Sequence, residues 1–149
     1  MNTTTPPRRK RHPVLLAVVA LIVGVALVTA CSGNRPARGF HSFIADVWVP
    51  KGATLDPKGN STTELWYANN TYGSTVEAMN SLLPVNQPLD GLPWCGSKTR
   101  TNSTDPTDTF WAWGTSTDMV DVGVVEIEGT TMITISHGPP SSGVCQPGA

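Results

Sequence analysis

The chain has 149 residues, about the length of one domain, which leaves little room for a second hydrophobic core. Four of its ten basic residues occupy positions 8–11 and all eleven acidic residues follow Cys31, so residues 31–149 carry six basic and eleven acidic side chains, a net charge of about −5. Such a surface repels phosphate backbones, and we expect no nucleic-acid partner.

The first 30 residues have the layout of an export signal. Residues 1–13 are polar and basic, and residues 14–28 form an apolar run interrupted only by Gly24. This run is at the short limit for a transmembrane helix, which needs about 20 apolar residues. A retained single-span anchor is therefore one alternative, and secretion without any anchor is another.

The residues that end this run, Val28-Thr29-Ala30-Cys31, resemble the lipobox of bacterial lipoproteins, with Val28 in place of the usual leucine. In that family the cysteine thiol receives a diacylglyceryl group and a peptidase then cleaves before the cysteine. The resemblance implies a signal peptide over residues 1–30, cleavage between Ala30 and Cys31, and a palmitate-type lipid on Cys31. It also implies attachment to the extracytoplasmic face of the cell membrane. Two acyl chains hold much more firmly than one, because each buried CH₂ contributes about 0.8 kcal/mol.

Lipidation of Cys31 would leave Cys95 and Cys145 as the remaining cysteines of an exported protein. We expect a disulfide between them, which would close a loop of about 50 residues and stabilise the fold by roughly 4 kcal/mol. The alternatives are two free thiols, or metal ligands together with His41 or His137. The spacing has no zinc signature, so we expect no metal and no cofactor.

Residues 32–39 are rich in Gly, Asn, Pro and Arg and are expected to form, after the lipidated Cys31, a short flexible tether. The domain is then expected to span residues 40–149. Its first strand is predicted at residues 40–49 by an alternating apolar face made of Phe43, Ala45, Val47 and Val49.

A turn-rich segment extends to residue 60, and a second strand is predicted at residues 62–68. Ser74 and Glu77 then form a capping-box pattern that predicts the start of a helix. Apolar residues at helical spacing follow, and Pro84 ends the helix after about ten residues. A helix this short is marginal alone and must pack on a sheet.

After a proline-rich loop, residues 95–100 are predicted as an edge strand and residues 102–108 as a polar turn. The clearest strands are residues 109–115, 119–128 and 131–136, and Gly129 favours a tight hairpin between the last two. The middle strand is predicted to be central, because apolar residues occupy both of its faces. The tail after His137 is expected to be irregular and held mainly through Cys145.

This order of elements predicts an α+β domain, with a single short helix packed on an antiparallel sheet of about 4–6 strands. The pattern over residues 64–136 is similar to small envelope lipoproteins of actinobacteria, which are largely of unassigned function. The resemblance supports the fold expectation and implies no chemistry.

Trp111 and Trp113 lie two residues apart on a predicted strand, so both rings emerge on one face. Such a ring pair can stack on a glycan or an apolar ligand, and we keep both residues as a possible ligand-stacking site. The competing interpretation is that the two rings belong to the core, because aromatic side chains bury large areas.

His41 and His137 could be combined with aspartates and serines into a hydrolase site, but no Gly-x-Ser-x-Gly motif is present. We interpret both histidines as surface residues at strand ends. The acidic residues near the last hairpin do not match an EF-hand loop and are interpreted as solvating charges on an exposed edge; they are Asp118, Asp121, Glu126 and Glu128.

Together these patterns lead us to expect an exported, membrane-anchored lipoprotein whose domain is not an enzyme but a binding or accessory module of the cell envelope. Its partner would be an envelope protein or a cell-wall glycan. A carrier of a small apolar or glycan ligand is the first alternative, and an envelope hydrolase is the second.

Overall fold

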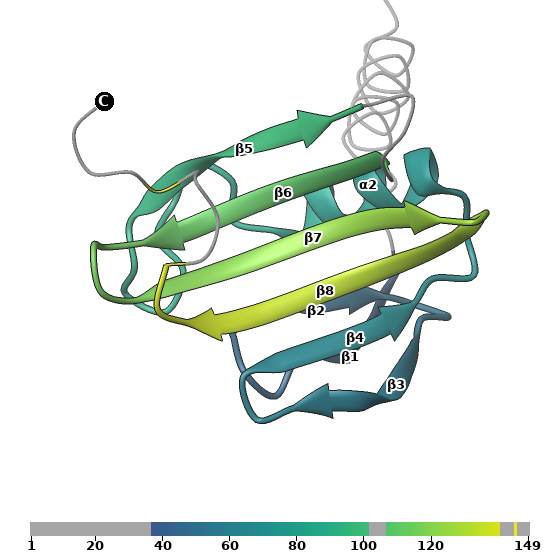
Figure 1. The fold of residues 1–149 in the computed structure, drawn as a ribbon, viewed down its shortest axis with the longest axis horizontal. Coiled ribbons are helices and arrows are strands. Elements are labelled where there is room, and N and C mark those ends of the chain that lie inside the picture. The colour runs from purple at the N-terminus through teal and green to yellow at the C-terminus, as the bar shows by residue number, and fades with distance from the viewer. Residues whose placement is uncertain (1–36, 102–106, 141–144, 146–149) are drawn as a thin grey trace, which may run out of the picture. The chain divides into compact units, whose positions relative to one another are not determined.

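The computed structural model describes residues 37–101, 107–140 and 145, which all belong to one compact unit, Arg35–Ala149. Within these ranges the chain forms eight strands and one helix (Figure 1). In chain order the elements are β1 (Arg38–His41), β2 (Trp48–Pro50), β3 (Thr54–Asn60), β4 (Thr63–Tyr67), α2 (Tyr72–Leu82), β5 (Trp94–Arg100), β6 (Thr107–Gly114), β7 (Met119–Ile127) and β8 (Thr130–Gly138).

Six of the strands form one sheet in the order β3-β4-β8-β7-β6-β5, and every neighbouring pair is antiparallel (Figure 1). The chain leaves β4, crosses one face of the sheet through α2, and enters the opposite edge as β5. Hairpins then lead back through β6 and β7 to β8, which pairs with β4. The expected α+β fold, one short helix on an antiparallel sheet, is therefore present.

The core lies on the face of the sheet that α2 crosses. Successive side chains of a strand point to opposite faces, so the alternation in β7 sends Val120, Val122 and Val124 to this side, where all three are fully buried. Ile133 and Ile135 of β8 lie directly opposite Val124 and Val122 and are equally buried. Residues of α2, including the fully buried Met79, cover the core on the side away from the sheet.

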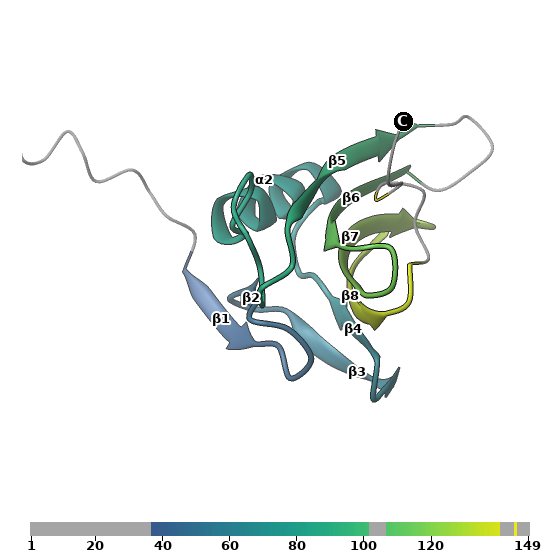
Figure 2. The ribbon, with the colours of Figure 1, turned by 90° about the vertical axis from the view of Figure 1, so that its left-hand side faces the viewer.

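β1 and β2 form a separate two-stranded sheet on the same side as α2 (Figure 2). Val47 and Val49 are buried in the main core, which fixes this small hairpin against the larger sheet. The prediction of one continuous strand over residues 40–49 is wrong, because the chain bends at residues 43–46. The Ser42 hydroxyl accepts from the backbone N–H groups of Ile44 and Ala45 and stabilises this bend.

The segment before residue 60, predicted to be turn-rich, contains the edge strand β3. Its Pro57 is compatible with an edge position, where one side of the strand needs no ladder donors. The helix also begins earlier than the capping box suggests: Thr71 is the N-cap, and its side chain accepts from the Ser74 N–H. The helix ends at Leu82, just before Pro84, as predicted.

Three other predictions are confirmed. β5 is an edge strand, β7 is central, and the β7–β8 turn places Glu128 and Gly129 at φ values of 50° and 77°. Both angles lie in the left-handed region that a two-residue hairpin turn requires. Across the described ranges, no helix combines the length and apolar character needed to cross a membrane.

Candidate functional site

The predicted processing and lipidation site, Ala30 and Cys31, lies outside the described residues and stays a prediction. The expected pairing of Cys95 with Cys145 is present, with an S–S distance of 2.05 Å. This disulfide joins the edge strand β5 to the C-terminal segment. It packs with Ala112 and Met119 in a small cluster separate from the main core.

Trp111 and Trp113 are 2% and 0% exposed and belong to the main core. The Trp111 indole N–H donates to the Asn80 side chain across 3.3 Å, and that of Trp113 donates to the Gln87 backbone carbonyl across 2.9 Å. Trp94 packs edge-on against Trp113. The expectation of a ligand-stacking pair is therefore wrong, because α2 and the loop that follows it cover this face of β6.

The two histidines contact different aspartates. His41 Nε2 is 2.7 Å from Asp46, and His137 Nε2 is 3.1 Å from Asp118. The other ring nitrogen of His137 is 3.3 Å from the Ile44 carbonyl oxygen. Among the described residues, the hydrogen-bond contacts of the two histidine rings are to carboxylate and backbone carbonyl oxygens, and none is to a serine or threonine hydroxyl.

The acidic residues near the last hairpin do not form one group. Asp118 precedes β7 and Glu128 follows it, so the whole length of a nine-residue strand separates them. β7 is a central strand and not an exposed edge, and Asp121 on it is only 8% exposed. In the part of the chain that the structure describes, no group of three His, Cys, Asp or Glu residues could hold a metal ion.

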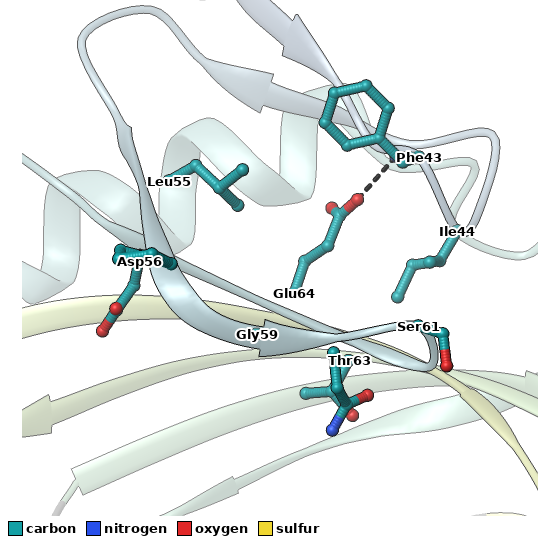
Figure 3. A pocket seen from close by; sticks show the side chains of 10 residues that line it. Phe43, Ile44, Leu55, Asp56, Gly59, Ser61, Thr63 and Glu64 are labelled. Atoms are coloured by element: carbon teal, nitrogen blue, oxygen red, sulfur yellow. Dashed lines mark hydrogen bonds between the residues drawn. The ribbon is translucent and has the colours of Figure 1, made fainter.

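The feature that does bring distant segments together is a groove of about 390 Å³ between the bend after β1 and the β3–β4 hairpin (Figure 3). Leu55 and Trp66 are directly opposite each other in the β3–β4 ladder, so their side chains share one face. Glu64 lies two residues before Trp66 on the same face. The groove is lined by Phe43, Ile44, Leu55, Asp56, Pro57, Gly59, Asn60, Ser61, Thr63 and Glu64.

Glu64 connects the two sides of this groove. The whole residue is only 5% exposed, and one carboxylate oxygen accepts from the Phe43 backbone N–H across 2.6 Å. The other oxygen accepts from the Trp66 indole N–H across 3.1 Å. Figure 3 shows Glu64 reaching from β4 to the bend that carries Phe43. A buried carboxylate needs such donors, and here the donors tie the first hairpin to the main sheet.

Apolar side chains stand around this buried carboxylate and remain exposed. Phe43 is 82% exposed and Leu55 is 40% exposed, and both line the groove. Phe40, which is 57% exposed, stacks on Trp66 with ring centroids 5.8 Å apart. Phe43 was expected on the buried face of a strand, and the bend at residues 43–46 turns it outward instead.

Asp56 lies at the other margin of the groove. It accepts from the Lys58 backbone N–H across 2.9 Å and from the Tyr67 hydroxyl across 2.8 Å. The first of these bonds, helped by the second, lowers the pKa of the Asp56 carboxyl below its ordinary value of 3.8. The same carboxylate raises the pKa of Tyr67 above 10.0. Asp56 is therefore ionised at neutral pH.

No sequence motif predicts this groove. The signals in the sequence are the alternation of Glu64 and Trp66 with Leu65 and Tyr67, and Ser42, whose hydroxyl stabilises the bend that exposes Phe43. No protein-family model, curated protein or solved structure matches the chain. The groove residues and the cysteine pairing therefore carry the argument for function.

Proposed function

We propose that the protein is an exported lipoprotein, held by a lipid on Cys31 at the extracytoplasmic face of the cell membrane, and that its domain is a non-catalytic binding module of the envelope. The cysteine pairing is the observation that carries this proposal. Two of the three cysteines form a disulfide, which suits an oxidising compartment, and Cys31 is the remaining thiol. It follows a basic and apolar leader at the lipobox position.

The anchor is tested by expressing the full chain in a bacterial host that is fed a labelled fatty acid. We expect label on the wild-type protein, a mature N-terminus at residue 31, and fractionation with membranes. Cys31→Ala should lose the label, while Cys145→Ser, which removes a different cysteine, should keep it. Label that persists in Cys31→Ala, or an unlabelled wild-type protein, would contradict the proposal.

The groove favours a second function for the same anchored domain, the binding of a small apolar or glycan ligand. Its volume of about 390 Å³ lies in the range of small-molecule sites. Phe43 and Leu55 offer apolar walls, while Ser61, at the turn between β3 and β4, offers a hydroxyl that can donate to or accept from a ligand.

Tryptophan fluorescence tests ligand binding, because Trp66 shares a face with Glu64 and Leu55 beside the groove. Titration with cell-wall glycan fragments or a fatty acid should give a saturable change in the wild type. Leu55→Arg should abolish the change, and Ile127→Arg, at another exposed apolar residue, should keep it. An unsaturable response, or equal responses in both variants, would exclude the groove as the ligand site.

A further inference from the structure

Three exposed apolar side chains, Phe40, Phe43 and Leu55, gather on one side of the domain and are called here the hairpin patch. They are three of the five large hydrophobic residues that are exposed in the described part of the chain. Phe40 stacks on Trp66, Leu55 lies opposite Trp66 in the ladder, and Phe43 is bound through its N–H to Glu64. All three residues are thus arranged around Trp66 and Glu64, and exposed apolar side chains grouped in this way are typical of contact surfaces.

We propose that the hairpin patch rests on the lipid bilayer and orients the anchored domain. The inference rests on the lipid on Cys31 proposed above, and it specifies what the domain contacts. The short stretch of chain between the anchor and β1 supports this placement. Seven residue steps separate Cys31 from Arg38, and even a fully extended chain of that length spans only about 25 Å.

The fully extended tether is shorter than the diameter of the domain, because a compact unit with the number of residues in Arg35–Ala149 is about 34 Å across. The point where β1 begins therefore stays near the bilayer, and the opposite pole cannot reach it. Phe40 lies within β1 and Phe43 only two residues after it, so the patch is on the part of the domain that the anchor holds closest to the lipid.

Charge supports the same placement. Residues 35–58, which contain the patch, carry four basic and two acidic side chains. Two further carboxylates accept from backbone N–H groups of this segment, Glu64 from Phe43 and Asp90 from Asp46, so this side of the domain is close to neutral. The other side chains of residues 59–149 include two basic and seven acidic ones, a net charge of about −5. An anionic leaflet therefore repels the rest of the domain more strongly than this side. Arg38 is held at this hairpin, with its guanidinium 5.4 Å from the centre of the Trp48 ring.

The side chains of the patch also suit a membrane interface. Phe and Leu side chains beside Lys and Arg are the composition that enters the boundary between headgroups and acyl chains. Lys51 and Lys58 are both exposed; Lys51 lies three residues before the strand that carries Leu55, and Lys58 lies within that strand. Contact here would turn the face of the sheet opposite α2 away from the bilayer, toward the envelope.

The test uses the full-length, lipid-modified protein in vesicles of phosphatidylcholine and phosphatidylglycerol that contain a lipid with a spin-labelled headgroup. Two matched variants each carry one fluorophore on an introduced thiol. Ser61→Cys lies at the groove beside the patch, and Ser97→Cys lies on β5, the opposite edge of the sheet. Five strand spacings separate the two edges, about 24 Å, which short-range quenching resolves.

We expect quenching at residue 61 to be at least about threefold stronger than at residue 97, since an interfacial segment lies among the headgroups. Proximity alone could arise from the short tether, so the Ser61→Cys protein is also made with Phe40→Ser and Phe43→Ser together. Loss of the patch should reduce quenching at residue 61 to the level at residue 97. An unchanged thermal unfolding midpoint confirms that the variants are folded.

Equal quenching at the two sites, or quenching that survives removal of both phenylalanines, would overturn the inference and leave a protein partner as the occupant of the patch. Mass spectrometry of the same preparation reports the lipid on Cys31. Acylated protein with equal quenching refutes the bilayer contact alone. Protein without the acyl mass refutes the proposed anchor and, with it, this inference.

Discussion

The Phe43 backbone N–H donates to the Glu64 carboxylate across 2.6 Å, although the two residues are 21 positions apart in the chain. Glu64 is almost fully buried, and its second oxygen accepts from the Trp66 indole. One side chain of β4 therefore fixes both the bend that exposes Phe43 and the ring on which Phe40 stacks. The hairpin patch depends on this carboxylate.

Glu64→Gln should destabilise the domain by about 1–3 kcal/mol, because an amide has only one acceptor oxygen and leaves one of the two N–H donors unsatisfied. Urea unfolding at neutral pH measures the change. Glu77→Gln, the same substitution at an exposed position on α2, should change the free energy of unfolding by less than about 0.5 kcal/mol. Equal effects of the two substitutions would mean that Glu64 does not hold the hairpin.

Removal of the disulfide should also destabilise the fold. The bond between Cys95 and Cys145 closes a loop with a sequence separation of 50, and Cys95→Ser with Cys145→Ser should lower the free energy of unfolding by about 2–5 kcal/mol. The unfolding midpoint in urea measures the loss. A reducing agent should bring the wild type to the midpoint of the double variant and leave the variant unchanged. A midpoint of the wild type that does not respond to reduction would argue against the bond.

The Asp56–Tyr67 pair predicts a specific dependence on pH. The pKa of Asp56 is lower in the folded state than in the unfolded state. Its contribution to folding stability is therefore complete above the pKa of the unfolded state, and it is lost as the pH falls through the folded-state pKa, which lies below 3.8. The pKa of Tyr67 is higher in the folded state than in the unfolded state. Its contribution to folding stability is therefore complete below pH 10.0, and it is lost as the pH rises through the folded-state pKa, which lies above 10.0. Tyr67→Phe should therefore lower the melting temperature most between these limits.

Melting temperatures of the wild type and Tyr67→Phe, measured from acid to alkaline pH, should converge below 3.8 and above 10.0. Tyr72→Phe is the matched control, because its hydroxyl bonds the neutral Thr109 hydroxyl and not a carboxylate. The difference in melting temperature between Tyr72→Phe and the wild type should not become smaller at acidic pH. A Tyr67→Phe difference that stays constant through the acid range would show that the ionised carboxylate is not its source.

The strands that build the core could be predicted because their side chains alternate. In β7 and β8, Val and Ile recur at every second position, and that period survives in the structure without interruption. The fold class followed from the order of these strands and the one helical stripe. β3 could not be predicted in this way, since Asp56, Pro57 and Gly59 all disfavour strands, and pairing with β4 overrides that preference.

The groove and the burial of the tryptophans depend on tertiary contacts, which the alternation of residues within one strand does not reveal. Alternation placed Trp111 and Trp113 on one face of β6, but which face α2 would cover is a tertiary property. The groove required the turn at Ser42 and the hydrogen bond from Phe43 to Glu64, which joins segments far apart in the chain. The pair Cys95 and Cys145, by contrast, was predicted correctly, from the odd number of cysteines together with the lipobox resemblance that assigns Cys31 to a lipid.

The close packing of the sheet face opposite α2 gives the last prediction, at Gly123 in the central strand. A Cβ atom there would lie 2.6 Å from the Thr134 hydroxyl oxygen and 2.7 Å from a ring carbon of Phe110. Neither distance is compatible with normal contact, so the ring and the hydroxyl would have to shift. We expect Gly123→Ala to destabilise the domain by about 1–3 kcal/mol, the usual effect of overpacking.

Gly73→Ala provides the matched control, because a Cβ atom at Gly73, in the first turn of α2, meets nothing within 4 Å. Alanine favours helix over glycine by about 1 kcal/mol, so this variant should be as stable as the wild type or more stable. Urea unfolding of both variants should therefore give changes of opposite sign. If Gly123→Ala also stabilised the protein, the Phe110 ring would have to leave Gly123 freely, and this face of the sheet would be an adaptable surface instead of a packed one.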